Sequence, residues 1–172
     1  MNRAYLSLGS NIEPERNLVQ AVRLLGECCR LSAVSAVYET RPVGRADQPN
    51  FLNAAVLLET ELAPEALKDT VLGPIEEELG RVRSADKNAP RTIDLDISLW
   101  NEEVLDLGPR HIPDPEIVQF PHIARPLANL APGYVHPETG LTRAEIADRL
   151  PDAGLVLRRE VVLTPAGEAS QQ

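Results

Sequence analysis

The chain has 172 residues, enough for one domain with a sizeable core and too few to expect two. Its formal net charge of -9 argues against sequence-independent binding to nucleic acid or to an anionic membrane, because either needs a net basic surface. No apolar run approaches the roughly 20 residues that span a bilayer, and the amino-terminal segment lacks the pattern of a signal peptide. Since Cys28 and Cys29 are adjacent and suggest no disulfide framework, a reduced, cytoplasmic location is the simplest interpretation.

The first third of the chain predicts a strand, a helix and two further strands. Residues 3–8 form the first expected strand, which ends in a Gly-Ser-Asn turn, and a helix should begin near Pro14. The buried stripe of this helix is expected to be Leu18, Val22, Leu25 and Cys29. Both cysteines are therefore interpreted as small side chains on the core side. Strands are predicted at 31–39 and 51–60, separated by a proline-rich loop.

A second helix is predicted to begin at Pro64. Its expected apolar stripe consists of Leu67, Val71, Ile75, Leu79 and Val82. Gly73-Pro74 should bend or interrupt it, because proline inside a helix removes a hydrogen bond. A loop at 83–90 then leads into a buried strand at 91–98. The order strand, helix, strand, strand, helix, strand predicts a ferredoxin-like α+β sandwich, with both helices on one face of an antiparallel sheet and the other face free for a site.

The remainder of the chain predicts C-terminal additions to this sandwich. A short strand at 103–107 and a loop at 108–116 come first. Short helices are expected near 121–130 and 142–149, followed by a possible last strand at 154–163. No composition break marks a boundary, so we expect a single domain over residues 1–162 and a mobile tail at 163–172.

Two aspartates one residue apart are the first sign of chemistry. Asp94 and Asp96 alternate with Ile93, Leu95 and Ile97 in the strand at 91–98. Because strand side chains alternate between faces, both carboxylates should point to one side, roughly 7 Å apart. That arrangement is repulsive unless water or a cation lies between the two charges.

The segment that leads into this strand is basic. It contains Arg81, Arg83, Lys87 and Arg91. Mg²⁺ typically takes one or two protein carboxylates plus substrate phosphates, and arginines hold phosphate oxygens through forked hydrogen bonds. The residues are thus compatible with a metal-dependent phosphate site, although no P-loop signature occurs. On spacing alone, a surface on which the aspartates form plain salt bridges with Arg81 or Arg91 stays an open alternative.

A second candidate site lies in the strand at 51–60. The amide of Asn53 suits a planar heterocycle with donors and acceptors on its edge, and Phe51 on the same face could stack on that ring. The alternative is that Phe51 is a core residue and Asn53 caps a sheet edge. Among the histidines, His136 is interpreted as structural. His111 or His122 could contact a phosphate or a ring, and the alternative for each is a surface or core residue with its hydrogen bonds satisfied.

At this point the sequence resembles a known family. The segments AYLSLGSNI, VYETRPVG…DQPNFLNAAVLLET, IEEELGRVR, APRTIDLDI and RPLANLAP occur in the order seen in 6-hydroxymethyl-7,8-dihydropterin pyrophosphokinases of folate biosynthesis. The resemblance covers about residues 4–140. It implies a ferredoxin-like fold and transfer of pyrophosphate from ATP to the pterin hydroxymethyl group, with release of AMP.

The resemblance also implies roles for individual residues. Asp94 and Asp96 match ligands of two Mg²⁺ ions bound with ATP, and Arg81 and Arg91 match catalytic arginines that hold phosphate. The implied pterin-binding residues are Thr40, Val43, Phe51, Asn53 and His122. The implied ATP-binding residues are Glu76, Arg81, Arg83, Arg91, Ile97 and Asp114. The chain departs from the commoner family pattern at Asn88, Asp114, Phe120 and His122.

The expected partners are ATP and a reduced pterin alcohol, bound by a monomer that could associate with other folate enzymes. Two alternative functions remain compatible with the sequence. The first is a non-catalytic ferredoxin-like binding module, and the second is a kinase that transfers a single phosphoryl group. The products formed from ATP and the pterin alcohol distinguish all three.

Overall fold

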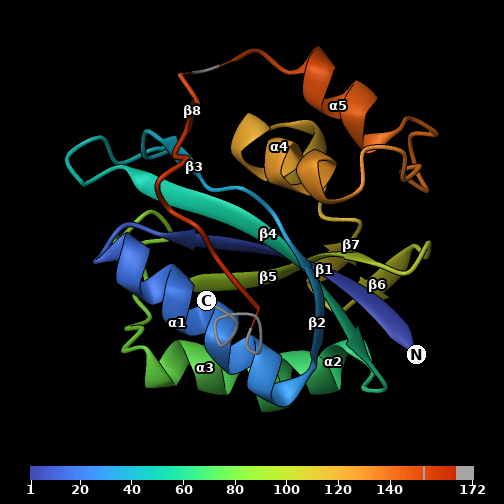
Figure 1. Cartoon of the computed structure of the whole chain (residues 1–172), viewed down its shortest axis with the longest axis horizontal. Helices are drawn as coiled ribbons and strands as arrows, with labels where there is room; N and C mark the ends of the chain where they lie inside the picture. Colours follow the sequence, from blue (N-terminus) through green and yellow to red (C-terminus); the bar gives the residue numbers. More distant parts are fainter. Residues whose placement is uncertain (153, 166–172) are drawn as a thin grey trace.

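An antiparallel sheet forms the centre of the computed structural model, which describes residues 1–152 and 154–165 (Figure 1). Its strands follow the order β5-β1-β4-β3-β8, and β2 also pairs with β4. Their bounds are β1 (Asn2–Ser10), β2 (Arg30–Val34), β3 (Tyr38–Thr40), β4 (Phe51–Thr60), β5 (Asp94–Trp100) and β8 (Val156–Leu157). β1 and β4 are buried along most of their length, which suits central strands covered on both faces. The predicted α+β sandwich is confirmed.

α1 (Pro14–Cys28) lies on one face of the sheet, beside the helical segment that runs from Pro64 to Glu78 (Figure 1). Leu18, Val22 and Leu25 are buried in the main core, as their spacing predicts. Cys29 is partly buried against the same core, but Cys28 is exposed, so the prediction for Cys28 is wrong. Cys28 is the last residue of α1, whereas Cys29 follows it with an extended backbone (φ -139°, ψ 165°), so the two side chains leave the chain in different directions.

The second helical segment continues through Gly73-Pro74. It consists of α2 (Pro64–Leu67), a π-helical turn η1 (Lys68–Leu72) and α3 (Gly73–Glu78). The Gly73 N–H group donates to the carbonyl of Lys68, five residues back, so the wider turn accommodates the proline without ending the helix. After α3, Gly80 has a φ of 81° and ends the helix. Val82 is consequently 82% exposed and is not part of the stripe, which corrects the sequence prediction.

The single strand predicted at 31–39 is two strands, β2 and β3, separated at residues 35–37. At the interruption, the Ser35 hydroxyl accepts a hydrogen bond from the Ala55 N–H group (2.8 Å). A side chain therefore replaces a carbonyl as the partner of β4 at this point. The predicted strand at 154–163 is likewise reduced to β8, while Val161 and Leu163 pack into the main core. The tail predicted at 163–172 falls mainly on residues 166–172, which lie outside the described residues.

The other face of the sheet is only partly free. α4 (Pro121–Leu130) lies on it against β4 and β1, and α5 (Arg143–Arg149) packs against α4 (Figure 1). A second apolar cluster forms there, with Tyr5, Leu57, Leu99 and Leu127 buried among its members. The segment predicted as a loop at 108–116 contains β7 (Arg110–Ile112), which pairs with β6 (Leu105–Leu107), and the start of a 3₁₀ turn, η2 (Pro115–Val118). The expectation of an uncovered face therefore holds only for the half near Asp94 and Asp96.

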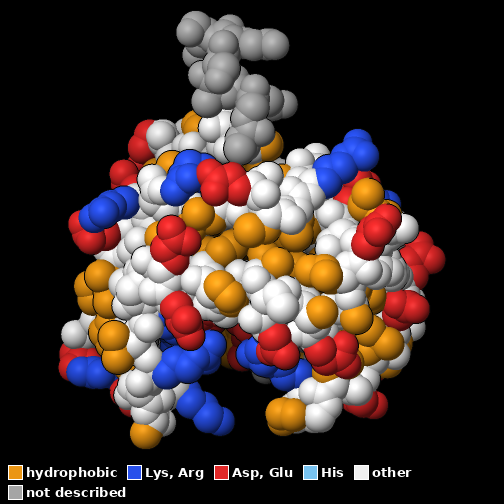
Figure 2. All heavy atoms as spheres, turned by 90° about the horizontal axis from the view of Figure 1, so that it is seen from below, with side chains coloured by type: hydrophobic (Ala, Val, Ile, Leu, Met, Phe, Trp, Pro, Cys, Tyr) orange, Lys and Arg blue, Asp and Glu red, His pale blue; other side chains and the backbone are white. Residues whose placement is uncertain are grey.

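Figure 2 views the molecule from below, on the side covered by α1 and α3. Apolar side chains run across the middle of this face, and charged side chains gather mainly around its rim. Among the described residues, no helix has the length and apolar character required to cross a membrane. The single-domain boundary at residue 162 stays a prediction.

Leu58→Ala tests the main core. Leu58 lies on β4 and is fully buried, so its truncation is expected to lower the free energy of unfolding by about 2–5 kcal/mol. Leu157→Ala is the matched control, because Leu157 is 39% exposed and its loss should cost about 0.5 kcal/mol or less. Urea denaturation measures both. Equal losses would contradict the assigned packing.

Candidate active site

Two pockets open on the uncovered half of the sheet and share a wall. The first, here the basic pocket, is lined by residues that include Glu76, Arg81, Arg83 and Arg110. The second, the aromatic pocket, is lined by residues that include Phe51, Asn53, Phe120 and His122. Four residues line both pockets: Lys87, Arg91, Asp94 and Asp96. The carboxylate pair predicted from the sequence therefore stands where the contents of the two pockets would meet.

The backbone of β5 positions the pair. Leu95 and Ile97 are buried in the main core, so Asp94 and Asp96 project from the opposite face, as the alternation predicts. On the neighbouring strand β1, Gly9 lies opposite Asp94 and Ser7 lies opposite Asp96. These small residues leave the space above the sheet open beside both carboxylates.

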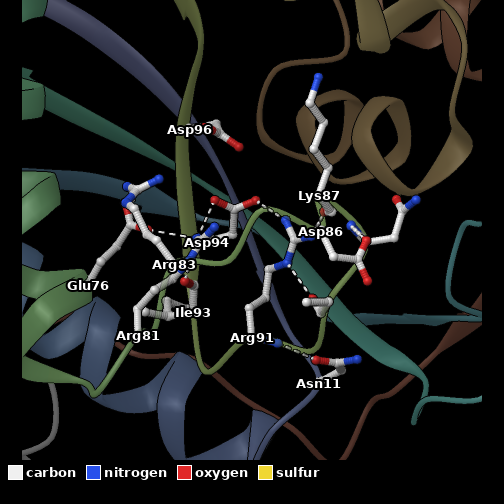
Figure 3. Close-up of polar contacts among 12 residues, drawn as sticks. Asn11, Glu76, Arg81, Arg83, Asp86, Lys87, Arg91, Ile93, Asp94 and Asp96 are labelled. Atoms are coloured by element: carbon white, nitrogen blue, oxygen red, sulfur yellow. Dashed lines mark hydrogen bonds and ion pairs between the residues drawn. The ribbon is translucent and has the colours of Figure 1, made fainter. Parts of the chain in front are cut away.

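Asp94 is held by two arginines (Figure 3). One Arg81 nitrogen, Nη1, lies 2.7 Å from Asp94 Oδ1, and Arg91 Nη1 lies 2.9 Å from Asp94 Oδ2. Burial alone would raise the pKa of Asp94, but the two guanidinium groups outweigh it and hold that pKa below its usual range. Asp94 is thus a carboxylate whose charge is balanced by the arginines.

The negative charge of Asp96 is balanced less completely than that of Asp94. Its Oδ1 lies 3.1 Å from Arg110 Nη1, and its side chain is 32% exposed. Burial, and then the charge of Asp94, raise the pKa of Asp96 to about 7, and Arg110 offsets only part of that effect. The pair therefore favours an added cation near Asp96.

The donor set of this pair fits Mg²⁺. The described residues contain no group of three or more histidine, cysteine, aspartate or glutamate side chains arranged to hold a metal ion. Two carboxylates facing a basic pocket are instead the set that Mg²⁺ uses when waters and substrate phosphates complete its shell. Asp94 and Asp96 could hold such an ion only together with a ligand in the basic pocket.

Arg81 is fixed from several sides at the end of the α3 segment. Besides Asp94, its Nη1 contacts Glu76 Oε2 at 2.7 Å and the Ile93 carbonyl at 2.9 Å (Figure 3). Glu76 is buried, which raises its pKa, while the charge of Arg81 opposes that shift. Arg83 is more exposed and lies 3.7 Å from Glu76. The basic pocket therefore contains Arg81, which several short contacts hold in place, and Arg83, which has fewer contacts and is more exposed.

The aromatic pocket has the features expected for a flat heterocycle. Asn53 is buried, and its Nδ2 donates to the Tyr38 carbonyl at 3.3 Å. A side chain on Gly9 would approach Asn53 Oδ1 at 3.5 Å, so glycine keeps the amide accessible. Phe51 lies beneath Arg91, whose guanidinium carbon is 5.8 Å from the ring centre.

His122 extends the aromatic wall from α4. Its ring lies 5.3 Å from the ring of Phe120, and the two planes are tilted by 35°. Burial lowers the pKa of His122 to about 4, so the imidazole is neutral at physiological pH. A neutral ring can pack against a ligand face as an aromatic residue does. Thr40 and Val43 line the same pocket.

Most residues predicted from the sequence meet in these two pockets. Ile97 does not line either of them, because its side chain lies in the main core. Asp114 lies at the start of η2, where its Oδ1 accepts from the Glu116 N–H group at 2.9 Å. His111 bridges Asp106 and Glu138 outside both pockets, and buried His136 accepts hydrogen bonds from a local turn, which is the structural role expected for it.

Sequence reasoning missed Ser7, Gly9, Gln48 and Glu116, which all line the aromatic pocket. Ser7 and Gly9 could have been found, because they alternate with the buried Leu6 and Leu8 in β1. Gln48 and Glu116 lie outside the strands and helices that form the sheet faces. No periodicity identifies them.

Comparison with known proteins agrees with this geometry. Residues 5–132 match the family model described as 7,8-dihydro-6-hydroxymethylpterin-pyrophosphokinase. A 2-amino-4-hydroxy-6-hydroxymethyldihydropteridine pyrophosphokinase of Pseudomonas aeruginosa is 42% identical over 142 residues, which are 80% of this chain and 86% of that protein. The Bacillus subtilis protein of the same name is 42% identical over 132 residues, or 75% and 78% of the two chains.

A solved structure of a Plasmodium falciparum HPPK-DHPS protein with pteroate shares the fold. Its TM-score is 0.63 at 16% identity, over 86% of this chain and 42% of that one. This chain therefore spans about two-fifths of that longer protein, and the likeness bears on the fold alone. The match over residues 5–132 and the two bacterial relatives decide the assignment. The chain belongs to the 7,8-dihydro-6-hydroxymethylpterin-pyrophosphokinase family.

Proposed function

We propose that this protein transfers a pyrophosphoryl group from ATP to the hydroxymethyl group of 6-hydroxymethyl-7,8-dihydropterin, releasing AMP, in folate biosynthesis. The observation that carries the proposal is the position of Asp94 and Asp96 between the basic pocket and the aromatic pocket. A phosphate chain in one pocket and a ring alcohol in the other would bring the reacting atoms together at this pair.

The triphosphate of ATP suits the basic pocket. Arg81 and Arg91 line this pocket, and their ion pairs with Asp94 hold the two guanidinium groups in place. The remaining N–H groups of both arginines can donate to phosphate oxygens. Arg83 and Lys87 add positive charge, and buried Glu76 lines the same space. Two Mg²⁺ ions held by Asp94 and Asp96 would neutralise charge on the phosphate chain. Ile97 and Asp114 stay predicted nucleotide contacts.

The pterin suits the aromatic pocket. Phe51 and His122 supply ring faces, and we infer that they pack on opposite sides of the pterin. The amide of Asn53 reads the edge of the heterocycle, with Thr40 and Val43 beside it. The hydroxymethyl group would then point toward the shared wall formed by Asp94, Asp96 and Arg91.

The reaction needs positioning and charge stabilisation more than a strong base. The pterin hydroxyl oxygen attacks the β-phosphorus of ATP in line and releases its proton to solvent, while the bond from that phosphorus to the oxygen bridging it to the α-phosphate breaks. AMP leaves with the electron pair of that bond on its phosphate oxygen. Arg81 and Arg91 stabilise the negative charge that shifts onto the bridging oxygen. A monomeric state, a cytoplasmic location and association with other folate enzymes stay predictions from the sequence.

Product analysis tests this function directly. With ATP, Mg²⁺ and the pterin alcohol, we expect AMP and the pterin diphosphate in equal amounts, detected by anion-exchange chromatography. Omission of the pterin alcohol or chelation of Mg²⁺ with EDTA should stop AMP formation. Release of ADP would indicate transfer of a single phosphoryl group, and no nucleotide product would indicate a binding module. Either outcome would reject the proposal.

Asp96→Ala tests the metal assignment. Loss of a carboxylate that helps to hold Mg²⁺ should reduce turnover by at least about 10³-fold. The fold should persist, because the change removes a repulsion with Asp94. Asp69→Asn, at an exposed position of η1, is the matched control and should retain full activity. Steady-state rates and thermal unfolding of each variant are the measurements, and an active Asp96→Ala enzyme would show that the assignment is wrong.

The buried neutral imidazole of His122 predicts a pH dependence of stability. The unfolded chain binds a proton at His122 below pH 6.5, whereas the folded chain does so only near pH 4. The free energy of unfolding should therefore fall as pH decreases from 6.5 to 4, by at most about 1.4 kcal/mol per pH unit from this group. His122→Phe should lack this contribution. Urea denaturation from pH 4 to 8 compares the two proteins, and parallel pH profiles would contradict the burial of a neutral His122.

A further inference from the structure

The short strand β3 supports several of the residues proposed to bind the pterin. Its last residue, Thr40, lies opposite Phe51 of β4, and both line the aromatic pocket. Tyr38 lies opposite Asn53, and its carbonyl accepts from Asn53 Nδ2 at 3.3 Å. This bond restrains the amide and leaves its second N–H bond and its oxygen for a ligand. The position of β3 therefore sets the geometry of this wall of the pocket.

β3 depends on the C-terminal segment, here residues 154–165, for its second neighbour. The strand has three residues, and β4 pairs with one of its edges. On the other edge, among the described residues, it pairs with β8, where Tyr38 lies opposite Leu157 and Glu39 opposite Val156. So short a strand with a free edge would open readily to water. The C-terminal segment thus makes β3 an inner strand of the sheet.

Arg158 joins this segment to the rest of the molecule. Its backbone N–H group donates to the Val37 carbonyl at 2.9 Å, directly beyond the paired residues of β8. In its guanidinium, Nη1 lies 3.2 Å from Glu39 Oε2 on β3, and Nη2 lies 3.2 Å from Glu15 Oε1 on α1. The third nitrogen, Nε, contacts Glu160 of the same segment. One side chain therefore pairs with carboxylates from three parts of the chain.

The contacts of Arg158 form a network rather than an isolated ion pair. A single exposed ion pair contributes little, but the side chains of Arg158 and Glu39 are only 25% and 31% exposed, so their charges are partly shielded from water. In Figure 1 the C-terminal segment, in red, passes from β8 toward α1. Beyond Arg158, the side chains of Val161 and Leu163 are buried in the main core. Apolar packing thus holds the end of the segment, while Arg158 holds β8 against β3.

We propose that Arg158 is a positioning residue for the pterin, which holds β3 in place through Glu39 and so keeps Thr40 and Asn53 oriented toward the ligand. The identity of this ligand rests on the proposed function. Arg158 lines neither pocket, so it acts through the strand and not by contact. Small displacements of a binding wall weaken the binding of a rigid ring. None of the described residues of β3 lines the basic pocket, so the effect is confined to the pterin.

Isothermal titration calorimetry tests this role by measuring the two ligands separately. The dissociation constant of 6-hydroxymethylpterin is measured with Mg²⁺ and saturating α,β-methylene ATP, which cannot release AMP, and that of the nucleotide analogue is measured without pterin. Arg158→Met keeps the side-chain length but removes the charge. It should weaken pterin binding about threefold, within the range for a partly exposed ion pair, and leave nucleotide binding unchanged. Arg158→Lys should restore part of the pterin affinity. Arg159→Met, at the exposed neighbouring position, is the matched control and should bind both ligands normally.

A double-mutant cycle tests the route through Glu39. Glu39→Met should weaken pterin binding as much as Arg158→Met does, and the double variant should bind no more weakly than either single variant, because each removes the same contact. Glu15→Met breaks only the contact with α1 and should have a smaller effect. Arg158→Pro removes the backbone bond to Val37 together with the ion pairs, and should weaken pterin binding by about tenfold or more.

These outcomes separate positioning from a general loss of stability. Partial unfolding would lower the thermal midpoint and weaken the binding of both ligands by the same factor, whereas lost positioning weakens pterin binding alone. An unchanged pterin affinity in Arg158→Met, equal weakening for both ligands, or additive losses in the cycle would overturn the proposal. Either result beside normal AMP formation would reject this proposal alone. An unmodified protein that binds no pterin would reject it together with the proposed function.

Discussion

The repulsion between two carboxylates on one face of β5 is the constraint around which the site is organised. Side chains two residues apart in a strand share a face, and burial beside a sheet makes their charges costly. Arg81 and Arg91 balance Asp94, whereas Arg110 is the single charged partner that the described residues give Asp96. The result is a site with a fixed anion and a second carboxylate that still favours a cation. A magnesium ion bound with a phosphate chain would satisfy both.

The rest of the fold delivers groups to this pair. β1 places Gly9 and Ser7 opposite the aspartates, which keeps the space above them open. The α3 segment ends so that Arg81 reaches both Glu76 and Asp94. α4 covers the far half of the same sheet face and brings His122 to the edge of the open half. The helices of the other face contribute no wall to the aromatic pocket among the described residues, yet their core holds β1, β4 and β5 in register.

The basic pocket and the aromatic pocket share a wall, so groups bound in the two pockets would lie next to each other. A ring alcohol and a phosphate chain need different binding groups, and the structure offers a separate aromatic wall and basic wall beside each other. The loops that complete both walls, residues 41–50 and 81–91, are linked by side-chain and backbone hydrogen bonds rather than by an apolar contact.

The sequence by itself determined the elements and the chemistry that depend on local pattern. Alternation identified the two faces of β5, helical spacing identified Leu18, Val22 and Leu25 as core, and the motifs around Arg81, Asp94 and Asn53 indicated the family. Only the tertiary structure decided what depends on packing between distant segments: the exposure of Val82, the coverage of half the sheet by α4, and the neutral His122. Gln48 and Asn11 belong to the same class, because their partners are groups of other loops and strands, which no periodicity of the chain encodes.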